Sequence, residues 1–397
     1  MFKQSLKLII FAGIAMILRY GYRISISRGM GLEAYGRVGV AMTILDVFVL
    51  FLLSSIPPTM AKFRAEGGLV LKSAYKFMYL GLGSSVLLLA LSPVVMKYME
   101  IPFTYILIIS GCILVGTVTA IFRGIMQGTH RTDEFGISQI VTAAGFFGFV
   151  LLSLYLGIGE IGAVLALFAG MSLPAFYLYP KVKLEKSDGD HFGKMWRYLV
   201  PISATRIIDA FVLNIDLLML KIWYPATVIG MYSIAGPIAG LPMVAFSSIA
   251  TVLLPKVSAS KKDGRMLTKK AAQISVVIIL GVLVLILLPK FFIKILFNPQ
   301  LTELEWAQTV ATLRIMAFST VFIGIYKLVA ASLQGMGMAK ELCYFTVMVL
   351  AVEILIGAAV IPEYGMLGAA GTTLVASGVA VTGALALLRR SEIHKRH

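Results

Sequence analysis

Apolar runs of about twenty residues recur along the whole chain, and they constrain its fold more than any other feature of the sequence. Of the 397 residues, 59% are hydrophobic and only 14% are charged, and the mean hydropathy is +0.92. A soluble domain averages about 25% charged residues, and so little polar surface could not cover a globule of this size. The composition excludes a water-soluble enzyme, a disordered chain and a disulfide-stapled secreted module. It indicates a protein that the lipid bilayer solvates.

Twelve runs are long enough to span a bilayer, since a hydrocarbon core of about 30 Å requires roughly 20 helical residues. They lie near residues 6–27, 37–58, 75–97, 104–127, 136–157, 161–180, 196–223, 230–254, 270–297, 308–334, 342–361 and 367–388. Between them, the glycine-rich stretch 24–37 predicts the first outer loop, 298–306 predicts the longest outer loop, and 362–365 predicts a short turn. We therefore expect an all-α integral membrane protein with twelve transmembrane helices.

Basic residues are distributed unevenly between the two sides of the expected membrane. The side that holds the amino terminus has 24 of the 35 lysines and arginines, with Arg123 and Arg131 counted there, while six lie on the opposite side and five within spans. Because positive residues collect in cytoplasmic loops, we expect a multi-pass protein of the cell (plasma) membrane with both termini in the cytoplasm. The same asymmetry explains the net charge of +16, and no aromatic-basic recognition motif indicates a nucleic-acid partner.

The chain contains an internal repeat with a nearly constant offset. Gly36, Ser54 and Lys62 recur 194 residues later as Gly230, Ser248 and Lys256; Gln127-Gly128 and Gly159-x-x-Gly162-Ala163 recur 207 and 206 residues later as Gln334-Gly335 and Gly365-x-x-Gly368-Ala369. An offset of six spans, an even number, gives both copies the same orientation. We expect two parallel six-helix lobes around a central cavity, suited to alternating access: residues 1–180, a cytoplasmic linker of 181–195, and residues 196–397.

Nine ionisable residues lie inside the expected spans, where each costs about 2.5 to 3.5 kcal/mol unless it is paired, reaches an interface or lines water. The candidate substrate-binding cations are Arg19, Arg23, Arg206, Arg314 and Lys327, and the candidate ion-coupling or charge-partner acids are Asp46, Asp209, Asp216 and Glu353. Five cations against four acids leave one net positive charge. That sign favours an anionic cargo, such as a diphosphate headgroup, over a cationic drug.

The cations differ in how strongly they indicate a binding site. Arg19 and Arg23 are four residues apart and share one helix face, where two guanidinium groups match phosphate geometry, although both could instead extend to the outer interface. Arg314 lies near the outer end of its span and could also snorkel. Lys327 lies deeper, and we expect it to contact substrate from the inner side.

The acids leave alternatives open. Arg206 and Asp209 are three residues apart and could neutralise each other, which would leave Asp216 without a local partner. Asp46 and Glu353 are isolated on apolar helices. Each is either a neutral acid hydrogen-bonded across helices or part of a proton or sodium site that drives transport.

Several motifs together resemble those of a known family. They are RGMGLEAYG at 28–36, AKFRAE at 61–66, Gln127-Gly128, and GMYS at 230–233. The chain resembles the polysaccharide and lipid-linked oligosaccharide flippases of the multidrug/oligosaccharidyl-lipid/polysaccharide exporter superfamily, which also holds the peptidoglycan-precursor flippase. The resemblance implies two six-helix lobes, alternating access, and a cationic cavity that receives the sugar-diphosphate head of a polyprenyl lipid. In the peptidoglycan-precursor branch, arginines of the first span line that cavity, and Arg19 and Arg23 occupy similar places here.

We therefore expect a flippase that moves a polyprenyl-(di)phosphate-linked oligosaccharide from the cytoplasmic to the outer leaflet. The alternatives are an ion-coupled exporter of drugs or small amphiphiles and a membrane-embedded glycan polymerase. A polymerase would place acids or histidines in a long outer loop, but 298–306 offers only Glu303 and Glu305, and all four histidines lie on the cytoplasmic side. We expect no catalytic residue, no metal site and no cofactor apart from a coupling Na+ or H+. The expected partners are the lipid-linked glycan and membrane lipids, bound by a monomer.

Overall fold

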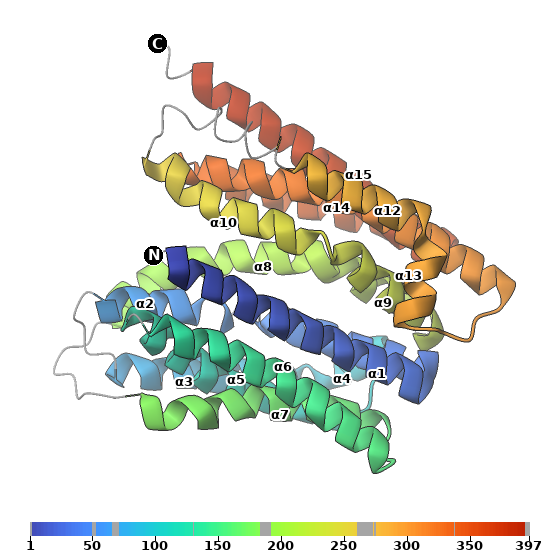
Figure 1. Ribbon diagram of the computed structural model, residues 1–397, viewed down its shortest axis with the longest axis horizontal. Coiled ribbons are helices and arrows are strands. Elements are labelled where there is room, and N and C mark those ends of the chain that lie inside the picture. The colour runs from blue at the N-terminus through green and yellow to red at the C-terminus, as the bar shows by residue number, and fades with distance from the viewer. Residues whose placement is uncertain are drawn as a thin grey trace. The chain divides into compact units, whose positions relative to one another are not determined.

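The computed structural model describes a protein whose helices are joined, within the described residues, by short turns and loops (Figure 1). The described residues are 2–49, 53–65, 71–129, 131–182, 192–259, 273, 275–336 and 338–393, and they contain no strand. In lipid, a helix is favoured because it satisfies its backbone hydrogen bonds within the segment. The expected all-α fold is confirmed. Most of the expected linker, 183–191, lies outside the described residues.

The chain divides into two compact units, Met1–Phe211 and Val212–His397, hereafter the first and second units. The helices of the first unit are α1 (Phe2–Phe48), α2 (Ile56–Ala65), α3 (Leu71–Ala90), α4 (Ser92–Met99), α5 (Phe103–Gly128), α6 (Thr132–Tyr155), α7 (Glu160–Leu178), the short 3-10 helix η2 (Tyr179–Lys181) and the first part of α8 (Phe192–Trp223). The second unit holds the rest of α8, α9 (Ala226–Gly240), α10 (Met243–Ala259), α12 (Val276–Leu287), α13 (Pro289–Leu296), α14 (Glu303–Gly335) and α15 (Ala339–Ile393).

Several of these helices cross a membrane. Among the described residues, six helices are long and apolar enough to do so, and eight if each of two bent pairs counts as one span. The bent pairs join α9 to α10 at 46° and α12 to α13 at 81°. Helices α1 and α8, which carry six of the nine intramembrane charges, are not among the six. The protein is therefore a multi-pass membrane protein.

Single glycines, rather than loops, interrupt the two longest helices. The stretch 24–37 is helical except at Gly31, where φ is 85° and ψ is 175°, so the predicted first outer loop is wrong. Glycine adopts a positive φ without steric cost, so one residue redirects the chain. Gly365, with φ 56°, interrupts α15 within the turn expected at 362–365.

The outer loop predicted at 298–306 is shorter than expected because a capping box starts α14 early. The Thr302 hydroxyl accepts a hydrogen bond from the Glu305 backbone N–H (3.4 Å), and the Glu305 carboxylate accepts one from the Thr302 backbone N–H (2.8 Å). Each side chain satisfies a donor that the first turn of a helix leaves unpaired. The helix therefore begins at Glu303, and Glu305 has a structural partner.

The two units share backbone landmarks in the same order. The repeated Gln-Gly dipeptides end α5 at Gly128 and α14 at Gly335. The glycines of the second repeated motif, Gly159 and Gly365, both have positive φ and both begin a helical stretch. Each unit also has a short helix with proline in its first turn, α4 and α13, followed by a left-handed residue, Glu100 or Asn298. The internal repeat in the sequence therefore corresponds to a repeat in local structure.

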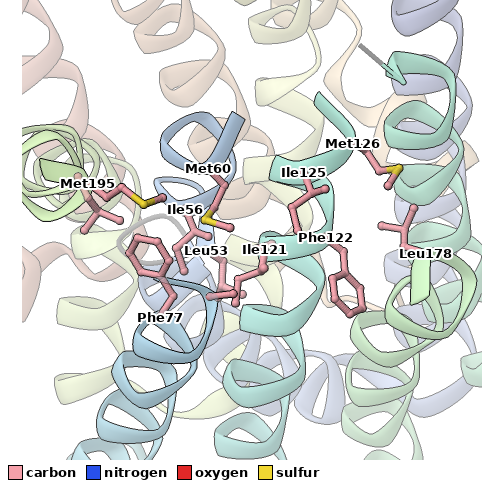
Figure 2. Packing of buried hydrophobic residues seen from close by; sticks show 13 residues of the cluster. Leu53, Ile56, Met60, Phe77, Ile121, Phe122, Ile125, Met126, Leu178 and Met195 are labelled. Carbon is pink, nitrogen blue, oxygen red and sulfur yellow. The ribbon is translucent and has the colours of Figure 1, made fainter. Parts of the chain in front are cut away.

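Interlocking apolar side chains pack the first unit. Ile56 and Met60 of α2, Phe77 of α3, and Ile121 and Ile125 of α5 lie in one cluster and are at most 2% exposed (Figure 2). Lipid tails are as apolar as these side chains, so burial alone gives little driving force, and close van der Waals packing holds such helices together. The cluster fixes α5 against α2 and α3.

Helices α6 and α7 pack closely at a pair of glycines. A Cβ added to Gly145 of α6 would lie 2.7 Å from the Cα of Gly170 on α7, whereas one added to Gly148, one turn later on α6, would meet no atom within 4 Å. Small residues allow transmembrane helices to pack backbone against backbone. The contact therefore depends on the absence of a side chain at Gly145.

We predict that Gly145→Ala lowers the free energy of unfolding by about 1 to 3 kcal/mol because the added methyl group overpacks the helix contact. The matched control, Gly148→Ala, should be unchanged or up to about 1 kcal/mol more stable, since alanine favours helix and has space there. Thermal unfolding of the purified protein in detergent, followed by tryptophan fluorescence, measures both. Equal midpoints for the two variants would contradict the assignment.

Candidate functional site

The two arginines of α1 lie beside an acid and a tyrosine from the other side of the Gly31 break. Arg23 donates a hydrogen bond to the Tyr35 hydroxyl, and Asp46 interacts electrostatically with both Arg23 and Arg19. Twelve residues of straight helix would separate Arg23 from Tyr35 by about 18 Å, so the chain must reverse at Gly31 to bring them together. Tyr35 is fully buried, Arg23 and Asp46 are partly buried, and Arg19 is exposed.

A third arginine belongs to this region, and the sequence analysis missed it. Arg123, counted with the inner-loop residues, lies within α5, five residues before the helix ends at Gly128. Its guanidinium donates hydrogen bonds to Ser138 and Thr142 of α6. It also interacts electrostatically with Arg19. The apolar residues on both sides of Arg123 were the signal that it belongs inside the span.

In the second unit, Asp216 is the acceptor of a buried hydrogen-bond network. The hydroxyls of Tyr232 on α9 and Thr373 on α15 both donate to its Oδ2, the latter at 2.9 Å, and the Leu217 backbone N–H donates to Oδ1 (2.7 Å). Asp216 is 5% exposed. The sequence singles out Asp216 as the acid without a local partner, and its side-chain partners come from two other helices, 16 and 157 residues away.

Glu353 of α15 lies close to this network. It interacts electrostatically with Asp216 and Tyr232, and it is 1% exposed. Neither carboxylate oxygen has a hydrogen-bond partner among the described residues. A buried polar group without a partner costs about 1 to 3 kcal/mol. Asp216, Tyr232 and Thr373 thus bring their oxygen atoms together, and Glu353 lies within electrostatic range of them. Carboxylate and hydroxyl oxygens are ligands that suit a proton or a hard cation such as Na+.

The remaining candidate cations have different environments. The Lys327 ammonium on α14 donates to the Ser247 hydroxyl on α10 (3.1 Å) and is partly buried. Arg314 is exposed, and its Nε donates to the carbonyl oxygen of Ile286 near the end of α12 (3.1 Å). The side chains of Arg206 and Asp209, on α8, lie outside the described part of the structure. Their expected mutual neutralisation stays a prediction.

Another charged cluster, which the sequence analysis missed, ties three helices of the first unit together. Arg37 of α1 donates to both oxygens of Glu160 on α7 (2.8 and 2.5 Å) and to Glu33 (2.5 Å), and the Tyr105 hydroxyl of α5 donates to Glu160 (2.9 Å). A bidentate arginine–carboxylate pair is stronger than a single contact. All formal charges in this cluster have partners, and its contacts join α1, α5 and α7.

The chain is similar to a known protein family and to a known membrane protein. The family model described as polysaccharide biosynthesis protein matches residues 2–261. An uncharacterized membrane protein of Methanocaldococcus jannaschii is 28% identical over 391 residues, which cover 91% of each chain.

Solved structures of transporters share the fold at low sequence identity. The lipid II flippase MurJ in an inward closed conformation superposes with a TM-score of 0.82 at 18% identity, covering 96% of this chain and 87% of that chain. An inward-facing multidrug resistance MATE transporter of the MOP superfamily gives 0.81 at 14% identity, covering 96% and 95%. A MOP superfamily transporter from Pyrococcus furiosus gives 0.74 at 15% identity, covering 98% and 94%. With the family model matching more than half of its length, the chain belongs to the polysaccharide biosynthesis protein family and has a fold shared with transporters of the MOP superfamily.

Proposed function

We propose that the protein is a flippase that moves a polyprenyl-(di)phosphate-linked oligosaccharide from the cytoplasmic to the outer leaflet. One observation carries the proposal: Arg19 and Arg23 interact electrostatically with each other and with one acid, Asp46, in the first unit. Among the described residues, this single carboxylate leaves one of the two guanidinium charges uncompensated. An anionic headgroup would compensate it, and the fork of donors on arginine matches phosphate oxygens.

The proposed architecture is that of alternating access. Twelve spans form two parallel lobes, residues 1–180 and 196–397, joined by a cytoplasmic linker of 181–195, with both termini in the cytoplasm of the cell membrane. The repeated landmarks in the two units support this arrangement, because a duplicated six-helix unit gives halves that can move against each other. The protein acts as a monomer, and the phosphate is held by arginines while the tail stays in lipid.

The second unit would couple transport to an ion gradient. Asp216, Glu353, Tyr232 and Thr373 supply the oxygen atoms for a proton or Na+, and Glu353 keeps both oxygens without a hydrogen-bond partner among the described residues. This same acidic site favours the rival function, an ion-coupled exporter of small amphiphiles. The arginines of the first unit argue against a cationic drug as cargo, since like charges repel.

A glycan polymerase is the weaker alternative. Of the two acids in the outer segment 298–306, Glu305 accepts hydrogen bonds from Thr302 in the cap of α14. A carboxylate engaged in a helix cap is poorly placed to act as an acid or base. Glu303 is then the remaining acid of that segment, and the expectation of no catalytic residue stands as part of the proposal.

The cargo assignment predicts that Arg23→Ala and Lys327→Ala each slow flipping by about tenfold or more, because a lost charge-assisted contact is worth about 1.5 to 3 kcal/mol. The flipping rate is measured in proteoliposomes that contain a fluorescent polyprenyl diphosphate-linked N-acetylglucosamine. It is the rate at which this probe becomes accessible to a membrane-impermeant quencher. Lys7→Ala is the control: it also removes a positive charge, but its ion pair with Asp133 is half exposed on both sides and contributes little. Unchanged rates in both variants would remove the cationic binding assignment.

The coupling assignment predicts two opposite effects at Glu353. Replacement by methionine, of similar volume, should raise the free energy of unfolding by about 1 to 3 kcal/mol, because it removes a buried carboxyl without hydrogen bonds. The same change should abolish the dependence of flipping on a Na+ or proton gradient. A substitution that stabilises the fold but abolishes function is expected where a residue with a functional role destabilises the folded state.

Parallel measurements on Glu341→Gln serve as the control, since this acid lies exposed in the first turn of the same helix. It should alter neither thermal stability nor gradient dependence by a measurable amount. A Glu353→Met protein that keeps normal gradient-driven transport would refute the coupling site and leave the cargo assignment standing.

A further inference from the structure

Among the described residues, the groups that hold Arg123 in place are all neutral. Its Nε donates to Ser138 Oγ (2.9 Å), and its Nη2 donates to the Ser138 carbonyl oxygen (2.9 Å) and to Thr142 Oγ1 (2.7 Å). Ser138 and Thr142 are at most 2% exposed, whereas Arg123 is partly exposed. The three bonds fix the plane of the guanidinium. Its Nη1 group has no hydrogen-bond partner among the described residues, so two N–H donors are left for a ligand.

The charged neighbour of Arg123 is another arginine. Arg19, which is exposed, interacts electrostatically with it. Arg19 has no hydrogen bond or ion pair in the described part of the chain, although Asp46 lies within electrostatic range of it. Two guanidinium groups within electrostatic range repel each other, and an arginine inside a span is costly unless a counter-charge or water meets it.

Two other arginines of the first unit have carboxylate partners. Arg37 contacts the carboxylates of Glu160 and Glu33, and Arg131 lies 3.5 Å from a carboxylate oxygen of Glu134. Arg123 lacks any such carboxylate among the described residues, although it lies deeper in its helix. The fold supplies orientation for this cation but no counter-charge, an arrangement expected when the counter-charge arrives with a ligand.

We propose that Arg123 and Arg19 form a phosphoryl-binding site on the face of α5 and α1, with Thr142 as a positioning residue that orients the Arg123 guanidinium. Arg19, Arg23 and Arg123 against Asp46 leave two positive charges. A diphosphate diester carries two negative charges at neutral pH, so one diphosphate neutralises the cluster. The identification of this diphosphate with the lipid-linked cargo rests on the proposed function.

The location of Arg123 suggests an order of contacts. It lies five residues, or about 7.5 Å along the helix axis, from the end of α5 at Gly128. In the proposed orientation this is the cytoplasmic end. Arg123 would therefore meet a phosphate entering from the inner leaflet, and Arg23, hydrogen-bonded to Tyr35, would be reached later.

The test measures binding of inorganic pyrophosphate and of farnesyl diphosphate to the purified full-length protein, by microscale thermophoresis in detergent. We expect Arg123→Gln and Arg19→Gln each to raise the dissociation constants of pyrophosphate and farnesyl diphosphate by about tenfold or more, as the loss of a charge-assisted contact predicts. The matched control Arg131→Gln removes an arginine that already has a carboxylate partner, and it should change them by less than about twofold. Unchanged binding in Arg123→Gln, or an equal loss in Arg131→Gln, would overturn the site.

A second variant keeps the test decisive if Arg123→Gln fails to fold. Thr142→Val preserves the charge and nearly the volume but removes one of the bonds that orient Arg123. It should weaken pyrophosphate binding about threefold to tenfold, and in the Arg123→Gln background, where that protein folds, it should have no further effect. A purely structural Thr142 would lower thermal stability without changing affinity, which would contradict its positioning role.

The outcome separates this site from the proposed function. Pyrophosphate binding that depends on Arg123 and Arg19, in a protein that does not flip the lipid-linked probe, would keep the phosphoryl site and reject the flippase assignment. Normal flipping together with unchanged pyrophosphate affinity in Arg123→Gln would do the reverse.

Discussion

The cost of a charged side chain inside a bilayer governs the organisation of this protein. A guanidinium or carboxylate away from water needs a partner, an interface or a ligand. Several charges of the first unit have ion-pair partners: Arg37 contacts Glu160 and Glu33, and Lys181 contacts Glu134 (2.6 Å). The charged residues without such an ion pair among the described residues are the candidates for binding sites. They are concentrated on α1 and α5 in the first unit and around Asp216 in the second.

Each unit holds a cluster of ionisable residues, basic in the first unit and acidic in the second. In the first, Asp46 interacts with Arg19 and Arg23, and Arg19 interacts with Arg123. In the second, Asp216 accepts hydrogen bonds from two hydroxyl groups and interacts electrostatically with Glu353. The chain belongs to the polysaccharide biosynthesis protein family and shares its fold with MOP superfamily transporters. Both findings are consistent with charged clusters among membrane-spanning helices. A cationic cluster suits an anionic headgroup, and an acidic one suits a small cation. Separate sites of this kind allow one gradient to drive the movement of another solute.

Two glycines that break helices bring together the residues of the basic and the acidic cluster. Gly31 reverses the chain in a single residue, and this reversal brings Tyr35 and Asp46 back to the arginines of the same helix. Gly365 interrupts α15 between Glu353 and Thr373, two members of the acidic site. Glycine is required at both breaks because φ is positive there. Both sites therefore depend on a helix break within the helix that supplies their residues.

The sequence by itself determined the class of the protein: apolar runs of membrane-spanning length require helices, and the duplicated glycine motifs marked where helices end or break. It also picked out Arg19, Arg23, Asp216 and Glu353, since an ionisable residue stands out in an apolar run. It placed the first outer loop wrongly, because three glycines in 24–37 look like a loop and only Gly31 leaves helical geometry. It also overlooked Arg123.

The tertiary structure alone decided which charges meet. Helical periodicity tells which residues share a face, but it does not tell which helix that face touches. The bonds from Arg123 to Ser138 and Thr142, and from Tyr232 and Thr373 to Asp216, join residues 15 to 157 positions apart. Their partners were fixed by how side chains of many different helices pack, and packing depends on the shapes of all of them at once.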